Sequence, residues 1–302
     1  MKHLFLINPY AGKADRSREI SRQAQALCQS LGEPCQIILS EFPGALAQAA
    51  RQAGQSGQET RLYACGGDGT FNEVVNGAYG FPNLSVTCFP CGSGNDFVKQ
   101  YDNPAPCFDL SRFARVQERI MDLIQVDDRL AVNICSVGFD ARIGTSIDAY
   151  RRNPLLSGNR AYQASVVVNL LKGVAKPCRV ELEGGVVVDG TLTLACVCNG
   201  SWYGGSYHPV PEANIFDGVL DVLTVKKVSR LTVAKVIGIY QRGGYAQLPE
   251  LISHYRTRSL RILTPKEEPV NVDGELMMRR DLSIEILPGA MRLFAPEGTW
   301  NT

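Results

Sequence analysis

The sequence predicts an α/β domain with a three-layer, mainly parallel sheet, followed by an antiparallel β-sandwich domain. The length of 302 residues exceeds what one core comfortably supports. The first third alternates short apolar runs with amphipathic stretches, as in β-α-β-α units around a parallel sheet. Beyond about residue 120, strand-like runs separated by Gly, Pro and Asn turns dominate, which is typical of a sandwich. We therefore expect domains at 1–122 and 123–302, with the last strand free to return to the first domain.

The first domain reads as a regular succession of strands and helices. Strands are expected at residues 4–7, 36–39, 62–65 and 85–89, and helices at 16–31, 43–52 and from about 70. Thr70 and Glu73 match the capping box Thr-x-x-Glu, which predicts the start of the third helix. In such a sheet, ligands bind beyond the carboxyl ends of the strands.

The second domain reads mainly as strands. They are expected at residues 129–137, 179–182, 191–199, 218–225, 259–263 and 282–287. Two helical stretches interrupt them, at residues 161–171 and 231–240.

Composition excludes several classes of protein. Lys and Arg (31) nearly balance Asp and Glu (30), so a uniformly basic nucleic-acid binder is not expected. The apolar run at the start is four residues long, too short for a secretory signal, and no stretch approaches the roughly 18 apolar residues of a membrane span. We expect a cytoplasmic chain that contacts membranes only at their surface.

The ten cysteines are expected to pack as small apolar side chains. Two pairs are close in sequence, Cys88 with Cys91 and Cys196 with Cys198. A zinc site usually needs four well-spaced ligands, and the chain has only three histidines. A redox role for Cys88 and Cys91 is the alternative.

Two glycine-rich turns follow consecutive strands. The first reads Gly66-Gly67-Asp68-Gly69 and the second Gly92-Ser93-Gly94. Such turns leave backbone N–H groups free to bind an anion, and a helix start adds to the attraction. Asp68 would repel phosphate unless Mg²⁺ lies between them. With Asn8-Pro9 after the first strand, the turns predict a nucleotide pocket; each alone is equally consistent with a tight strand-to-helix turn.

The familiar phosphate-binding fingerprints are incomplete or absent. The second turn lacks the third glycine of Gly-x-Gly-x-x-Gly, which disfavours a dinucleotide-dependent oxidoreductase. The chain contains no Gly-x-x-x-x-Gly-Lys-Ser/Thr, so it is not a P-loop protein.

The ordered set of motifs resembles the diacylglycerol kinase catalytic-domain family, most closely the soluble bacterial diacylglycerol and related lipid kinases. The resemblance covers nearly the whole chain. Its motifs are Asn8-Pro9-x-x-Gly12, Gly66-Gly67-Asp68-Gly69-Thr70, Gly92-Ser93-Gly94-Asn95-Asp96-Phe97, Gly138-Phe139-Asp140, Asn199-Gly200, Gly204-Gly205, Asp217-Gly218 and Asp273-Gly274-Glu275. Because Gly-Gly-Asp-Gly-Thr is shared with NAD kinases and resembles phosphofructokinases, the resemblance implies that fold for the first domain.

The resemblance also implies a nucleotide site and two places for metal. ATP with Mg²⁺ is expected around Asn8, Pro9, Tyr10, Ala11, Gly12, Ser40, Gly66, Gly67, Asp68, Gly69, Thr70, Phe71, Asn72, Gly92, Ser93, Gly94 and Asn95. Asp68 is expected to act in catalysis through water on Mg²⁺. A structural Mg²⁺ is implied at Asp217, with backbone carbonyls near Asn214 and Val219.

The function implied is a lipid kinase that transfers the γ-phosphate of ATP to the hydroxyl of diacylglycerol or a related lipid. Asp273 is expected to act as base, with Glu275 assisting or exchanging roles, since the sequence does not rank them. Asp273-Gly274 would also make a good type I′ hairpin turn. Trp202-Tyr203 departs from the family pattern and leaves the identity of the acceptor open.

Partners and rival functions complete the expectations. An excess of cations in residues 226–261 suits either anionic lipid headgroups at the inner face of a membrane or a plain solvated surface. The resemblance makes a homodimer plausible. The alternatives are an NAD or sugar kinase of the same superfamily and a non-catalytic nucleotide-binding sensor.

Overall fold

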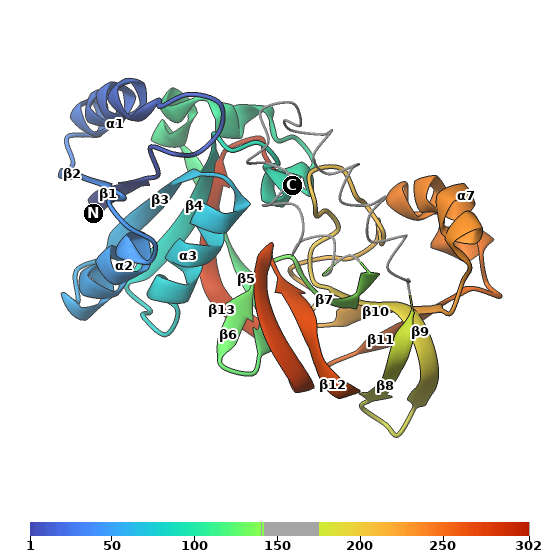
Figure 1. Cartoon of the computed structure of the whole chain (residues 1–302). Coiled ribbons are helices and arrows are strands. Elements are labelled where there is room, and N and C mark those ends of the chain that lie inside the picture. The colour runs from blue at the N-terminus through green and yellow to red at the C-terminus, as the bar shows by residue number, and fades with distance from the viewer. Residues whose placement is uncertain (140, 142–174, 302) are drawn as a thin grey trace. The chain divides into compact units, whose positions relative to one another are not determined.

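A computed structural model describes residues 1–139, 141 and 175–301, which divide into two compact units (Figure 1). Unit 1 comprises Met1–Leu123, Trp202–Ser206 and Pro288–Thr302, and unit 2 comprises Ile124–Ser201 and Tyr207–Leu287. The helix expected at residues 161–171, and Asp140 of the Gly-Phe-Asp motif, lie outside the described residues. Within the described ranges, no helix is long and apolar enough to cross a bilayer.

Unit 1 is built on a parallel sheet. Its parallel strands are β1 (Lys2–Ile7), β2 (Cys35–Leu39), β3 (Thr60–Gly66), β4 (Leu84–Pro90) and the last part of β13 (Glu275–Pro296). They lie in the order β2-β1-β3-β4-β13, and each neighbouring pair is parallel. The first part of β5 (Val116–Val126) also belongs to unit 1. The helices are α1 (Ser17–Leu31), α2 (Ala45–Gln55), α3 (Asp68–Ala78), the short α4 (Asp96–Lys99), and two 3₁₀ turns, η1 (Ala105–Phe108) and η2 (Leu110–Ala114).

Helices cover both faces of this sheet, which confirms the predicted three-layer α/β fold. Phe5 and Ile7 of β1 pack with Ile20 and Leu27 of α1. Figure 1 shows α2 and α3 on the other side of the strands from α1. The central strands are thus buried on both faces, and in β4 every residue is buried, including Ser85 and Thr87.

The predicted capping box at the start of α3 is wrong. Helix α3 begins at Asp68, its N-cap is Gly67, and no side chain caps it. The Glu73 carboxylate instead accepts hydrogen bonds from the backbone N–H groups of Leu46 (2.9 Å) and Ala47 (3.3 Å), in the first turn of α2. The first N–H groups of a helix need outside partners, and a neighbouring helix supplies one here because the N-cap of α2 is Gly44.

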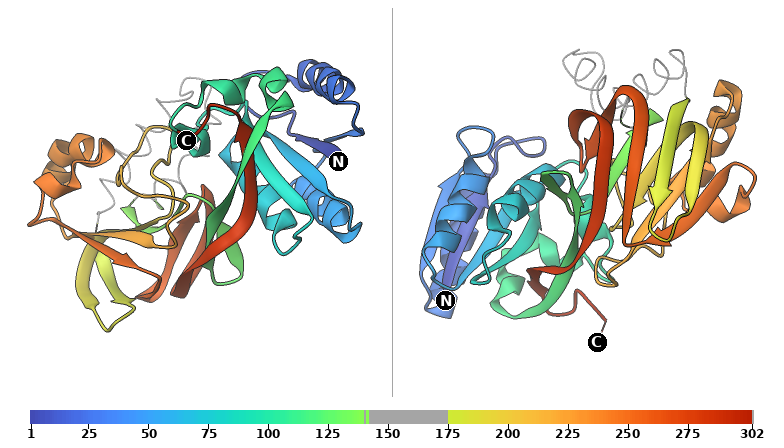
Figure 2. Two further views of the ribbon diagram at one scale, coloured as in Figure 1. Left: turned by 180° about the vertical axis from the view of Figure 1, so that it is seen from behind. Right: turned by 90° about the horizontal axis from the view of Figure 1, so that it is seen from below.

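Unit 2 is built from antiparallel pairs of strands (Figure 2). They are the end of β5 (Val116–Val126), β6 (Arg129–Ala131), β7 (Ile134–Gly138), β8 (Lys176–Leu182), β9 (Val187–Cys198), β10 (Leu220–Lys226), β11 (Ile252–Thr257), β12 (Ser259–Val272) and the first part of β13. Its described helices are α7 (Arg230–Gln241) and the 3₁₀ turn η3 (Tyr245–Gln247). Strands β5 and β13 each contribute residues to both units.

Four strands of unit 2 form a closed ring of antiparallel pairs. Strand β9 pairs with β7 along one part of its length and with β8 along another, and β12 does the same. The register of β12 against β13 shifts between Leu263 and Glu268, after the part of β12 that pairs with β8 and before the part that pairs with β7. The buried side chains of this ring form one apolar core with those of β10 and β13, including Val180, Val197 and Ile262.

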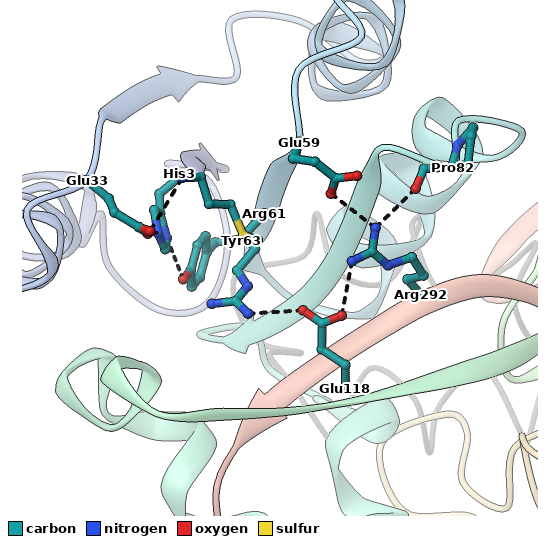
Figure 3. Close-up of polar contacts among 9 residues, drawn as sticks. His3, Glu33, Glu59, Arg61, Tyr63, Pro82, Glu118 and Arg292 are labelled. Carbon is teal, nitrogen blue, oxygen red and sulfur yellow. Dashed lines mark hydrogen bonds and ion pairs between the residues drawn. The ribbon is translucent and has the colours of Figure 1, made fainter.

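A buried polar chain lies at the amino end of β1 and β3 (Figure 3). The His3 side chain is fully buried; its Nδ1 lies 2.9 Å from the Tyr63 hydroxyl, and its Nε2 contacts Glu33. The Met1 ammonium reaches Glu33 at 3.4 Å, and Arg61 is the other charged group acting on the ring. Burial lowers the pKa of His3, although Glu33 opposes the shift. A neutral imidazole that accepts from Tyr63 and donates to Glu33 satisfies every partner.

Because the pKa of His3 is lowered in the folded protein, we predict that acid destabilises unit 1 through this residue. The contribution is fully present above the ordinary histidine pKa of about 6.5 and is lost as pH falls through that value toward the folded pKa. The measurement is the free energy of unfolding by urea between pH 8 and 5, for the parent and His3→Gln. The parent curve should fall more steeply. His208, whose pKa burial also lowers, leaves a residual slope in both proteins; parallel curves would refute a role for His3.

Candidate active site

The turns that follow β1, β3 and β4 meet at the carboxyl end of the sheet in unit 1. A Cβ atom added to Gly92 would lie 2.4 Å from the Cα of Gly67, so the two glycine turns touch backbone to backbone. A Cβ on Gly12 would lie 2.4 Å from the carbonyl oxygen of Cys91, and Gly12 has φ +79°. The contacts explain why glycine is needed at these positions.

The turn after β1, which begins at Asn8, is hydrogen-bonded to the start of α3. The Asn8 side-chain amide donates to the Thr70 hydroxyl at 3.1 Å, and its oxygen accepts the Tyr10 N–H at 3.0 Å. A Cβ on Gly66 would lie 2.2 Å from that same Thr70 hydroxyl. The N-terminus of α3, an 11-residue helix, therefore opens at this point, where its dipole favours an anion.

Asp68 is the acidic group of this cluster. One of its oxygens accepts the Phe97 backbone N–H at 2.9 Å. Burial raises the pKa of Asp68, and the nearby Asp96 carboxylate raises it further. A Cβ on Gly94 would lie 3.0 Å from the other oxygen, so the second turn packs directly on this carboxylate. A partly desolvated carboxylate beside a like charge is a good partner for a hard cation.

The other residues predicted to bind the nucleotide differ in their exposure and in their hydrogen-bond partners. The Asn95 side chain is used within its own turn, because it accepts the Gly92 N–H at 2.9 Å and donates to the Gly92 carbonyl at 3.0 Å. Ser93 is exposed. Ser40 follows β2, and its N–H donates to the Ile7 carbonyl at 2.8 Å, which brings it to the same edge of the sheet. Phe71 and Asn72 are buried in α3.

Sequence reasoning missed a loop that completes unit 1. Residues 202–206 belong to unit 1 although they lie far along the chain in the domain expected to be the sandwich. Asp96 accepts the Gly205 N–H at 2.6 Å. Lys99 donates to Asp96 at 2.6 Å and to the Gly205 carbonyl at 2.7 Å, and its ammonium lies 5.6 Å from the centre of the Trp202 ring. The available signal was the Gly204-Gly205 pair beside the unusual Trp202.

Asp273 and Glu275, the two predicted bases, lie in unit 2 in different surroundings. Asp273 (φ +49°) and Gly274 (φ +94°) form the turn between β12 and β13, as a type I′ hairpin requires. The Asp273 carboxylate accepts the backbone N–H groups of Val132, Asn133 (3.0 Å) and Ile134 (2.9 Å). Those bonds interrupt the single strand predicted at 129–137, which is why β6 and β7 are separate.

Glu275 is the more accessible of the two. Its side chain is 58% exposed, and one oxygen pairs with the Arg129 guanidinium at 3.0 Å. The two carboxylates therefore do not act as an equivalent pair in unit 2: Asp273 holds a turn, while Glu275 stands at the surface.

Asp217 has a cationic partner of its own. One oxygen accepts the Val219 N–H at 3.1 Å, and the other pairs with Arg256, whose Nε also lies 3.6 Å from Asp221. The Asn214 side-chain oxygen is taken by the Phe216 N–H at 3.1 Å. The Asn214 backbone carbonyl accepts the Asp217 N–H at 3.4 Å, and Arg256 supplies a positive charge at the place where the metal was predicted. Within the described part of the chain, no group of three or more His, Cys, Asp and Glu could hold a metal. The metal at Asp217 stays a prediction.

The cysteine thiols behave as packing groups. Eight of the ten are buried, Cys35 is exposed and Cys91 is intermediate, and all ten are thiols outside any disulfide. Burial raises the pKa of Cys91 to about 11 and that of Cys88 further from its usual range. Thiols with such pKa values are poor nucleophiles at neutral pH, which weighs against the redox alternative.

Comparison with known families identifies the class of protein. The family model described as diacylglycerol kinase catalytic domain matches residues 2–126, and the model described as YegS C-terminal NAD kinase beta sandwich-like domain matches residues 133–295. The chain is therefore a two-domain kinase. It belongs to the diacylglycerol kinase catalytic-domain family with a YegS-type C-terminal domain, as its motifs predicted.

Relatives and solved structures agree with this assignment. A probable lipid kinase YegS-like of Chromohalobacter salexigens is 28% identical over 300 residues, which span 95% of this chain and 92% of the relative. A putative lipid kinase of Staphylococcus aureus is 23% identical over a match that covers 91% of this chain and 90% of the relative. A putative diacylglycerol kinase of Bacillus anthracis has the same fold, with a TM-score of 0.74 at 20% identity over 99% of this chain and 97% of that structure.

The contact between the glycine turns leads to a prediction about stability. Gly92→Ala should destabilise the protein by ~1–3 kcal/mol, because the new methyl group has no room beside Gly67 and the turns must separate. Gly69→Ala is the matched control: no atom lies within 4 Å of a Cβ there, and alanine is the better helix former. Urea unfolding of the two variants measures the difference. Equal stability would mean that the turns do not touch.

Proposed function

We propose that this kinase uses ATP and Mg²⁺ to phosphorylate the hydroxyl of a lipid, diacylglycerol or a relative of it. The observation that carries the proposal is the meeting of three glycine-bearing turns around the half-buried Asp68 in unit 1. Close backbone approach, a free helix start and one carboxylate are what a nucleotide triphosphate with its metal needs. The names of the relatives, all lipid or diacylglycerol kinases, support a lipid acceptor.

Each part of unit 1 has a role in this proposal. The backbone N–H groups of the glycine turns and of the first turn of α3 would bind the phosphates of ATP. Asp68 would hold Mg²⁺, directly or through water, and the bound ion would neutralise charge on the phosphate oxygens. Asp96 and Lys99 would keep the Trp202–Ser206 loop against the second glycine turn. The other residues expected around ATP keep that role as a proposal.

We propose Glu275, and not Asp273, as the general base. A base must present a free oxygen to the acceptor hydroxyl, and the Asp273 oxygens already accept three backbone N–H groups. Glu275 is held by a single ion pair with Arg129, which orients it and leaves its second oxygen accessible. Glu275 would take the proton of the acceptor hydroxyl. The hydroxyl oxygen would attack the γ-phosphorus of ATP, and ADP would leave.

The acceptor of a lipid kinase lies in a bilayer, so transient contact with a membrane surface is part of the proposal. A homodimer stays a prediction.

The proposal is tested by a panel of acceptors. The full chain is mixed with ATP, Mg²⁺ and detergent micelles that contain diacylglycerol, phosphatidylglycerol, a sphingoid base or undecaprenol, and released ADP is measured. NAD⁺ and glucose are included as acceptors for the rival kinases. ADP release that depends on a lipid and on Mg²⁺ is expected. Release only with NAD⁺ or glucose would replace the proposal, and ATP binding without transfer to any acceptor would indicate the nucleotide-binding sensor.

A pair of variants tests the assignment of the base. Glu275→Gln should lower turnover by about 10²-fold or more and leave ATP affinity unchanged, because it removes only the basic oxygen. Asp273→Asn should lower the melting temperature instead, since one oxygen and the charge that bind Val132, Asn133 and Ile134 are lost. The measurements are turnover at saturating ATP, calorimetric ATP binding and thermal unfolding. The roles are reversed if Asp273→Asn folds as stably as the parent but loses turnover while Glu275→Gln retains it.

A further inference from the structure

Helix α7, labelled in Figure 1, has a buried side and an exposed side in its pattern of residue burial. Val233 and Tyr240 are its buried residues, and Val233 packs with Phe139 and Val228 of unit 2. At 100° per residue, the opposite side of the helix carries Leu231, Ala234, Lys235 and Gly238, and the C-cap residue Arg242 continues that side. All of these are exposed except Gly238, which is half-buried. We call this surface the outer face of α7.

The outer face combines an exposed apolar side chain with positive charge. Leu231 is 76% exposed, more than any other large aliphatic side chain in the described part of the chain. One exposed leucine is ordinary by itself. Here it stands one turn of helix from Lys235 and directly after Arg230. An apolar side chain flanked by long cationic ones is the pattern of a helix that lies in a membrane interface.

The charge around α7 is of one sign and is not compensated. Residues 226–249 contain five cations and no Asp or Glu, namely Lys226, Lys227, Arg230, Lys235 and Arg242. In the ranges that the structure describes, none of the five forms an ion pair. By contrast, Arg256 and Arg261, from the second half of the basic region, pair with Asp217 and Asp281. In the second half of the region only Arg258 is likewise exposed and without an ion pair among the described residues, so the unpaired charge of the region is concentrated around α7.

We infer that the outer face of α7 is the surface by which this protein docks on anionic membranes. The inference rests on the proposed lipid acceptor and names the element that brings the enzyme to it. An anionic bilayer satisfies both features at once: its headgroups attract the cations, and its acyl boundary accepts Leu231. A nucleic acid or another polyanion would use only the charge. A helix needs about 20 residues to span a bilayer. With 12 residues, α7 is too short for that and would lie along the membrane surface.

Vesicle binding tests this surface without relying on catalysis. The full chain is sedimented with vesicles of phosphatidylcholine containing about a third phosphatidylglycerol, and with vesicles of phosphatidylcholine alone. The parent should bind the anionic vesicles and release them at high salt, because the attraction is electrostatic. Lys235→Glu should weaken binding by roughly fivefold or more, and Leu231→Ser should weaken it at unchanged charge. Lys266→Glu and Val186→Ser are the matched controls, since both parent residues are exposed and lie away from α7.

The outcomes separate this inference from the proposed function. Equal vesicle binding by the parent and both α7 variants overturns the docking surface, whatever the acceptor panel shows. Loss of binding in Lys235→Glu but not in Leu231→Ser, with competition by soluble heparin, makes the face a polyanion site and overturns the membrane assignment. Vesicle binding that depends on both residues supports the docking surface, even where no lipid in the panel is phosphorylated and the proposed function fails.

Discussion

The contact between Gly67 and Gly92 is the constraint on which unit 1 depends. Side chains at these positions would hold the turns after β3 and β4 apart, because a Cβ at Gly92 already falls 2.4 Å from the neighbouring Cα. Because glycine has only a hydrogen atom at this position, the turn after β4 packs against Asp68, whose carboxylate accepts a hydrogen bond from the Phe97 N–H. The same approach puts Asp68 beside Asp96, which raises its pKa together with burial. The chemistry that we propose for this edge of the sheet therefore depends on glycine at both positions.

Charged groups in this protein take their roles from their partners. Asp96 is almost fully buried, and it binds Lys99 and a backbone N–H of a loop 109 residues further along the chain. Asp273 binds three backbone N–H groups about 140 residues earlier and so becomes part of a turn. Glu275, two residues away, keeps an accessible oxygen. A carboxylate whose two oxygens both accept backbone N–H groups contributes structure, and one with a free oxygen is available for proton transfer.

Some cations of unit 2 form ion pairs with its carboxylates and others do not. This difference bears on which surface could contact a lipid membrane. Arg256 and Arg261 are committed to carboxylates of the unit itself. Those around α7 have no such partner among the described residues, and Leu231 is exposed in their midst. A surface charge with an internal partner gains little from an outside one, since forming the new contact would break the old. Local pairing therefore decides which part of a basic stretch can act on a membrane.

The sequence by itself determined the first four strands of unit 1, the glycine turns and the family. Apolar runs of strand length and glycines at tight turns are local signals, and local sequence carries them. What only the tertiary structure decided are the long-range partners: Glu73 capping α2 and not its own helix, the Trp202–Ser206 loop joining unit 1, and Arg256 taking the oxygen of Asp217. A carboxylate looks the same in sequence whichever donor it meets. Packing brings that donor to it from a distant part of the chain, so no local pattern could have named it.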